Sequence, residues 1–164
     1  MNFRLKLSNY LYIVIISLCT FYVEAKSFPK NFHSEYQLYQ EESFLGEVIV
    51  DFRQKNNKYE INALTRTEGI MRLLGNREII SKGQLSSNGF TPKKFELRNE
   101  KKPKRNVVAI FDYQKDQVQI NYKEEISNHL LMKKHLDVLT YLYQFNFESL
   151  NKKIYIFEIV DGKK

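Results

Sequence analysis

The chain has 164 residues, of which 43% are hydrophobic and 14% aromatic. Its length is that of one domain, and this much apolar area excludes an intrinsically disordered chain. The formal charge is +7, from 26 basic and 19 acidic residues, but the basic residues are scattered and gather only at Lys93-Lys94 and from Lys101 to Arg105. Because no nucleic-acid-reading motif accompanies these clusters, we expect no nucleic acid as a partner.

The N-terminal segment has the organisation of a secretory signal. Residues 1–9 carry two basic side chains, and Tyr10 to Val23 is a run without charge that is too short for a membrane-spanning helix, which needs roughly 20 residues. A small residue, Ala25, predicts cleavage directly after it. We therefore expect residues 1–25 to be a signal peptide and 26–164 to be one β-rich domain, periplasmic and without a stable membrane span. An uncleaved anchor is the alternative.

Cys19 is the only cysteine of the chain. A bacterial lipoprotein carries its acylated cysteine after a small residue, whereas the bulky Leu18 precedes Cys19. We therefore expect no lipid attachment at this position. Cleavage of the signal would then leave a mature chain with neither a thiol nor a disulfide.

From His33 onward, apolar and polar residues alternate with a period of two, which is typical of strands with one buried face. Polar turns separate these stretches, and Asn88-Gly89 is the strongest hairpin signal because both residues tolerate a positive φ. The sequence thus predicts a mainly β protein whose roughly eight antiparallel strands form a curled sheet or an open barrel. The predicted strands are Glu35–Gln40, Phe44–Arg53, Tyr59–Arg66, Arg77–Leu85, Phe90–Arg98, Val107–Tyr113, Gln117–Tyr122 and Lys153–Val160.

Two stretches do not alternate. Gly69 to Gly75 is apolar and bracketed by glycines, so it is predicted to be a loop or a single turn. From Asp137 to Ser149, apolar residues recur at helical spacing, with Asp137 placed as the N-cap and with Leu136 and Tyr141 placed as a hydrophobic staple. We expect this one helix to pack on one face of the sheet or to plug one end of it.

No motif for catalysis or metal binding is evident. The histidines, His33, His129 and His135, do not have the spacing of a zinc site, and each is expected at an exposed loop position. The acidic pair Glu124-Glu125 is expected in a solvated loop, and the chain has no nucleophile motif and no phosphate-binding glycine loop. We therefore predict no enzyme, no catalytic residue, no metal and no cofactor. Carboxylates assembled from distant strands stay open as an alternative.

The remaining candidates for a binding site are aromatic and aliphatic. In a curled sheet they could line an apolar cavity for a lipid or another apolar ligand, with the Gly69 to Gly75 stretch, including Leu73, as a flap. The other interpretation is that the aromatic residues fill the core. The predicted ligand-binding residues are Phe44, Phe52, Tyr59, Ile70, Met71, Leu74, Phe95, Phe111 and Tyr113.

Eight short elements follow one another along the chain: Glu35-Tyr36-Gln37-Leu38, Leu45-Gly46-Glu47, Lys58-Tyr59-Glu60-Ile61, Thr67-Glu68-Gly69-Ile70, Ser81-Lys82-Gly83, Gly89-Phe90-Thr91-Pro92-Lys93-Lys94-Phe95, Phe111-Asp112-Tyr113 and Leu136-Asp137-Val138-Leu139-Thr140-Tyr141-Leu142-Tyr143. In this order they resemble domain-of-unknown-function family 3108, exported proteins of Gram-negative bacteria. The resemblance implies a periplasmic β-rich fold and carries over no catalytic residue. It also implies further strands past the end of this chain, so we expect a shortened member or an incomplete reading frame.

These observations favour a periplasmic, non-enzymatic protein that binds a lipid-like ligand or an envelope protein. A structural or interaction module without a small ligand is a second hypothesis, which an open sheet edge or an exposed apolar patch would favour. A hydrolase that acts on the envelope is a third, which a cluster of buried acids would favour. The sequence predicts no oligomeric state.

Overall fold

The computed structural model describes residues 28–131, 135–148 and 154–162. The predicted signal peptide at residues 1–25, including Cys19, lies outside these residues. No helix of the described ranges is long and apolar enough to cross a membrane.

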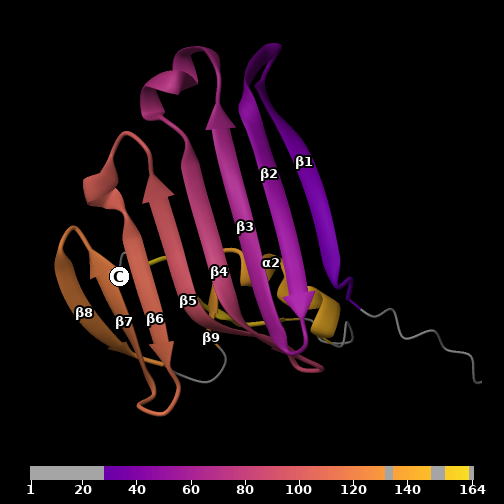
Figure 1. Ribbon diagram of the computed structural model, residues 1–164, viewed down its shortest axis with the longest axis vertical. Helices are drawn as coiled ribbons and strands as arrows, with labels where there is room; N and C mark the ends of the chain where they lie inside the picture. The colour runs from indigo at the N-terminus through magenta and orange to yellow at the C-terminus, as the bar shows by residue number, and fades with distance from the viewer. Residues whose placement is uncertain (1–27, 132–134, 149–153, 163–164) are drawn as a thin grey trace, which may run out of the picture.

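Eight antiparallel strands form one sheet, in which each strand pairs with its neighbours in the sequence (Figure 1). The order runs from β1 to β8, so the sheet is a meander, and among the described strands β1 and β8 are its edges. The predicted mainly β fold, with about eight antiparallel strands in a sheet that does not close, is confirmed. The strands are β1 (Asn31–Gln40), β2 (Ser43–Lys55), β3 (Lys58–Thr67), β4 (Arg77–Ser86), β5 (Gly89–Asn99), β6 (Val107–Asp112), β7 (Gln117–Tyr122) and β8 (Glu125–Leu130).

The other elements lie in the loops of the sheet or follow it. They are η1 (Gly69–Leu74), η2 (Pro103–Arg105), β9 (His135–Asp137), α2 (Thr140–Gln144), η3 (Phe145–Phe147) and β10 (Glu158–Val160). The strands β9 and β10 pair in parallel as a small second sheet. Figure 1 shows α2 and β9 behind the eight-stranded sheet, so these elements cover one face of it.

The two faces of the sheet differ because successive side chains of a strand point to opposite sides. On the covered face, Phe52, Ile61 and Phe95 are at most 1% exposed. On the other face, opposite charges pair across neighbouring strands, as Lys82 does with Glu60 at 3.0 Å. The sheet therefore has one apolar face under the C-terminal segment and one charged face toward solvent.

The core under the covered face has two parts. The first cluster gathers around Phe52 and Tyr59 and includes Leu136 from the segment that covers the sheet. The second cluster gathers around Phe95 and includes Val160 from β10. The segment from β9 to β10 therefore completes both clusters.

Three strands, β8, β9 and β10, differ from the sequence prediction. No strand is predicted over Glu125–Leu130, where β8 lies, because all its residues are exposed and its sequence need not alternate. Glu125 thus begins a strand, and only Glu124 occupies the expected turn. The predicted strand Lys153–Val160 is reduced in the described residues to β10, which pairs with β9 and not with the large sheet.

The predicted helix over 137–149 is shorter in the structure, and its last position lies outside the described residues. α2 has five residues and continues into η3. Asp137 is the last residue of β9, and its Oδ1 accepts hydrogen bonds from the backbone N of Leu139 and Thr140, each at 2.9 Å. The carboxylate thus caps a turn ahead of the helix, and the residue directly before α2 is Leu139. The predicted staple partners, Leu136 and Tyr141, both pack in the first cluster.

All three histidines lie in strands, so their predicted loop positions are wrong. His33 in β1 and His129 in β8 are exposed, whereas His135 in β9 is only 6% exposed. Asp51 and Glu35 lie against the His33 ring and raise the pKa of its imidazole. The stretch predicted to be a loop or a single turn forms η1.

Gly83 lies at an irregularity in the pairing of β4 with β5. A Cβ at this position would lie 2.2 Å from the carbonyl O of Thr91 and 2.9 Å from Cε1 of Tyr59. Because the first contact is with backbone, we expect Gly83→Ala to lower the free energy of unfolding by about 2 kcal/mol, as overpacking does. Urea unfolding followed by circular dichroism measures this loss.

The matched control for Gly83→Ala is Gln84→Ala in the same strand. Gln84 is exposed, so its truncation should change stability by less than about 0.5 kcal/mol. Equal stability of the two variants would contradict the assignment of Gly83 as a position of close backbone approach.

Candidate functional site

Four of the nine predicted ligand-binding residues are core residues. Phe52, Tyr59, Phe95 and Phe111 are between 0 and 4% exposed. The ring of Tyr59 lies edge-on to that of Phe90 with centroids 4.9 Å apart, and Phe52 stacks on Phe32 at 5.1 Å. These four side chains pack in the two core clusters.

Four others lie at one end of the sheet and reach solvent. Ile70 is 78%, Leu74 49% and Phe44 40% exposed, while Met71 is partly buried. The backbone N of Glu68 donates to the carbonyl O of Leu45 at 2.8 Å, which holds η1 against the start of β2. The structure therefore brings Phe44 and η1 together, and it separates them from the buried four. The glycine bracket around η1 was the sequence signal for this exposed loop.

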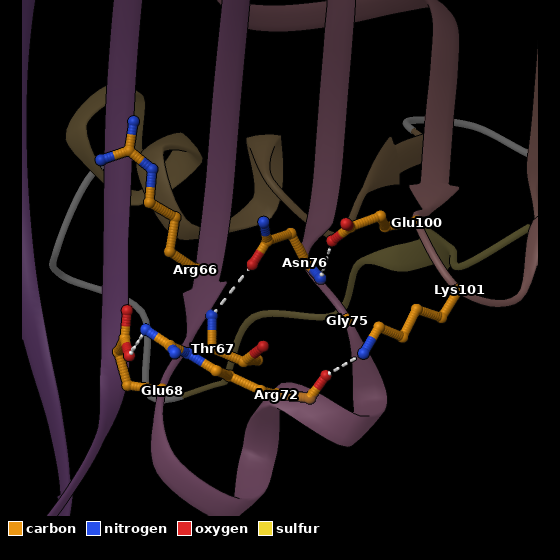
Figure 2. Close-up of a pocket in the computed structure, with 8 residues that line it drawn as sticks. All are labelled: Arg66, Thr67, Glu68, Arg72, Gly75, Asn76, Glu100 and Lys101. Atoms are coloured by element: carbon orange, nitrogen blue, oxygen red, sulfur yellow. Dashed lines mark hydrogen bonds and ion pairs between the residues drawn. The ribbon is translucent and has the colours of Figure 1, made fainter.

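A hollow of about 300 Å³ lies at the base of η1, between this loop and the ends of β3, β4 and β5 (Figure 2). Its lining is polar and charged. Asn76 crosses it, since its Oδ1 accepts from the backbone N of Thr67 at 3.1 Å and its own N donates to Glu100 Oε2 at 2.7 Å. Figure 2 shows Lys101 reaching to the carbonyl O of Arg72, at 2.7 Å. These bonds fasten η1 to the neighbouring strands.

The polar lining of the hollow was not predicted from the sequence. Asn76 and Glu100 belong to no motif. Only the cluster of basic residues from Lys101 to Arg105 is visible in the sequence. Arg72 forms an ion pair with Glu68, and Arg66 forms another with Glu47 at 2.9 Å. Most charged side chains that line the hollow therefore interact with other groups of the protein. These interactions hold η1 in place.

A second polar cluster is buried beneath the sheet around Asp137, which is fully buried. Its Oδ2 accepts a hydrogen bond from Ser81 Oγ at 2.5 Å, and the hydroxyl of Tyr59 lies 3.0 Å from the same Oγ. The Thr140 Oγ1 accepts from the backbone N of Asp137 at 2.9 Å. Burial raises the pKa of Asp137 above its ordinary value, although the hydrogen bonds to Ser81, Thr140 and Leu139 oppose that shift.

The α2 helix fastens the β4–β5 hairpin close to this cluster. The Oε1 of Gln144 accepts from the backbone N of Phe90 at 3.0 Å, and its Nε2 donates to the carbonyl O of Asn88 at 3.2 Å. A Cβ on Gly89 would lie 2.3 Å from the Gln144 Oε1. Glycine is therefore required in this turn both for its positive φ of 97° and for the approach of Gln144.

The ninth predicted residue, Tyr113, lines a separate open hollow of about 410 Å³ with Asn88, Phe90, Thr91 and His135. The Nζ of Lys93 lies 4.5 Å from the centre of the Tyr113 ring. The ring is partly buried, and this burial raises the pKa of its hydroxyl.

The contacts of Asp137 define the chemical character of this cluster. Burial raises the pKa of the Asp137 carboxyl, and its oxygens accept hydrogen bonds from a hydroxyl and from backbone N–H groups. In the described ranges, no group of three or more His, Cys, Asp or Glu side chains could hold a metal ion. The Asp137 cluster therefore has the character of a structural anchor between β4 and the turn before α2.

The elements that point to a known family converge on this anchor. Tyr59, Ser81, Gly89 and Asp137 come from four of the eight quoted elements and lie in or beside it. A family model described as "Protein of unknown function (DUF3108)" matches residues 35–159. The chain belongs to this family. The predicted resemblance is confirmed, and the DUF3108 match runs from β1 to β10, including η1 and the Asp137 cluster. No curated protein and no solved structure matches the chain.

Proposed function

We propose that this DUF3108 protein is an exported, non-enzymatic protein of the Gram-negative envelope that binds a lipid-like ligand. It binds this ligand on the exposed end of its sheet, at η1 and the start of β2, and not inside a closed cavity. The single observation that carries the proposal is the exposure of apolar side chains at η1, where Ile70 is 78% and Leu73 is 74% exposed.

The exposure of η1, like that of the edge strands β1 and β8, contrasts with the covered face of the sheet. The covered face buries its aromatic residues in two packed clusters, and the opposite face carries paired charges such as Arg98 with Glu78 at 3.1 Å. Large apolar side chains that a fold leaves in water are typical of surfaces that bind apolar partners. The order of a basic segment, an uncharged run and Ala25 supports export.

The sheet edges support a second candidate, an interaction module for an envelope protein. β1 pairs only with β2 among the described strands, so its outer edge is open. This edge strand is exposed along most of its length, with Tyr36 at 53% and Tyr39 at 56%. An open edge of this kind can accept an extended segment of a partner through backbone hydrogen bonds.

Native mass spectrometry tests the lipid proposal. The chain is expressed with its own leader in a Gram-negative host and purified separately from periplasm and membranes. We expect a chain that begins at Lys26 and that retains a lipid-class adduct. The variant Ile70→Ser/Leu73→Ser should lose most of that adduct, because it removes the apolar contact surface.

The control for this experiment is Ile126→Ser/Leu130→Ser on β8. These two side chains are 64% and 80% exposed but lie on the far edge of the sheet, so the adduct should persist. Bare protein from both fractions, or equal loss in the two variants, would count against the lipid proposal. A protein partner that co-purifies and depends on β1 would favour the second candidate instead.

A further inference from the structure

We propose that the η1 end of the sheet docks on a bilayer surface that contains anionic lipid. Ile70 and Leu73 enter the boundary of the acyl chains, and the basic loop, defined as Lys101 to Arg105, contacts the lipid phosphates. This inference rests on the proposed function, because it names the ligand class for the same end of the sheet.

η1 presents apolar side chains that the core does not use. No residue of this 3-10 helix is buried, and Leu74 is 49% exposed in addition to Ile70 and Leu73. The bonds at its base hold the loop in place, as Gly75 N donates to the carbonyl O of Arg72 at 3.2 Å. A short, fixed, apolar projection can insert at the depth of the headgroups, where removing apolar area from water is favourable.

The basic loop lies beside η1. Figure 1 shows that the β3–β4 and β5–β6 connections leave the same end of the sheet, and Lys101 Nζ donates to the carbonyl O of Arg72 at 2.7 Å. All the basic side chains of this loop are exposed. Within the described part of the chain, none of them takes part in an ion pair with a carboxylate. Cations beside an apolar projection match the order of a bilayer surface, in which phosphates lie above acyl chains.

The acids at this end leave an excess of positive charge. Glu68 and Glu47 are neutralised by ion pairs with Arg72 and Arg66. The acids of this end outside such pairs are Glu41, Glu42, Glu100, Glu124 and Glu125, and the matching cations are the four of the basic loop with Arg77 and Lys123. The excess of positive charge over the whole end is therefore small, and it is concentrated on the basic loop. An anionic surface is therefore favoured over a zwitterionic one, and the attraction should weaken with salt.

A single-tryptophan probe tests the position of docking, because the chain has no Trp of its own. Leu73→Trp is mixed with vesicles of phosphatidylethanolamine that contain phosphatidylglycerol, and with vesicles of phosphatidylcholine alone. We expect a blue shift of emission with the first vesicles only. Ile126→Trp on β8 is the matched probe and should show no shift. A signal at Leu73→Trp reports on η1 whether or not the leader segment is present.

Charge variants test the role of the basic loop. Lys102→Gln/Lys104→Gln should weaken binding to the phosphatidylglycerol vesicles roughly tenfold or more, as expected for two cations near an anionic surface. Lys55→Gln/Lys58→Gln removes the same charge from the β2–β3 turn at the opposite end of the sheet and should leave binding nearly unchanged. Both variants change exposed residues, and circular dichroism verifies that they fold.

The proposal is overturned if Leu73→Trp shows no shift with the anionic vesicles, if Ile126→Trp shifts equally, or if the two lysine variants lose binding equally. Failure here with a lipid adduct in native mass spectrometry would leave the proposed function in place and reject only the bilayer surface. A stable complex with a protein that buries η1 without vesicle binding would likewise reject it.

Discussion

Replacing Asp137 by alanine is expected to lower the free energy of unfolding by about 3 kcal/mol. The substitution removes the acceptor of the Ser81 hydroxyl and of the backbone N of Leu139 and Thr140, all of which are buried. Buried donors without partners cost about 1 to 3 kcal/mol each, partly offset here by the removal of a buried carboxyl. Urea unfolding at neutral pH measures the loss.

Asp137→Asn is the matched variant. Its amide keeps an oxygen for the two backbone N–H groups and offers an N–H group to the oxygen of Ser81, so it should cost about 1 kcal/mol or less. A loss as large as that of Asp137→Ala would contradict the hydrogen-bond assignment.

The stability of the parent protein and that of Asp137→Asn should also depend differently on pH. Burial raises the pKa of Asp137 in the folded state above the value of about 3.9 in the unfolded chain. As pH rises from that value, the unfolded chain loses its proton first, so this group destabilises the fold progressively until the folded carboxyl also ionises. The stability of the parent protein relative to Asp137→Asn should therefore fall as pH rises and then level off. A relative stability that rises with pH would contradict the raised pKa.

Phe95→Ala is expected to have the largest effect of any single truncation discussed, about 3 to 5 kcal/mol. The Phe95 side chain is fully buried in the second cluster, and a Cβ on Gly162 would lie 3.4 Å from its Cε1. Removing the ring leaves a cavity between β5 and the C-terminal segment that rigid neighbours cannot fill. Thermal and urea unfolding measure the change.

Phe44→Ala is the control for this truncation. This substitution removes a ring of the same size, but from a side chain that is 40% exposed. The free energy of unfolding should therefore fall by about 1 kcal/mol or less. A loss as large as that of Phe95→Ala would show that the start of β2 is packed more tightly than its exposure indicates.

The sequence predicts the parts of this fold that depend on local pattern. Strands β2 to β7 bury one face, so their alternation is visible, and Asn88-Gly89 marks the turn between β4 and β5. β8 escapes prediction because no residue of it is buried. The last predicted strand differs from β10 because β10 pairs with β9. That pairing depends on how the chain folds back across the sheet, which the local sequence pattern does not indicate.

The candidate site also has features that the sequence predicts and features that it does not. The glycines at either end of the apolar stretch indicate the exposed η1 loop without a structure. The sequence places Asp137 as the N-cap, whereas the residue directly before α2 is Leu139 and Asp137 caps the turn ahead of it. The bond from Ser81 to Asp137, across 56 residues, is not visible in the sequence. Nor does spacing reveal that four predicted ligand-binding residues are core residues, because a strand that faces a cavity and one that faces a core have the same alternation.

The return of the C-terminal segment across the sheet has a consequence for the order of folding. Every pairing in the meander joins adjacent strands, so each hairpin closes a short loop at a small cost in chain entropy. Ser81 and Asp137 meet across a far longer stretch of chain. A polypeptide that emerges with its N-terminus first can thus form most of the sheet before β9 and β10 pack on the apolar face. During that interval the nascent protein is exposed to aggregation, and docking of β9 and β10 ends it.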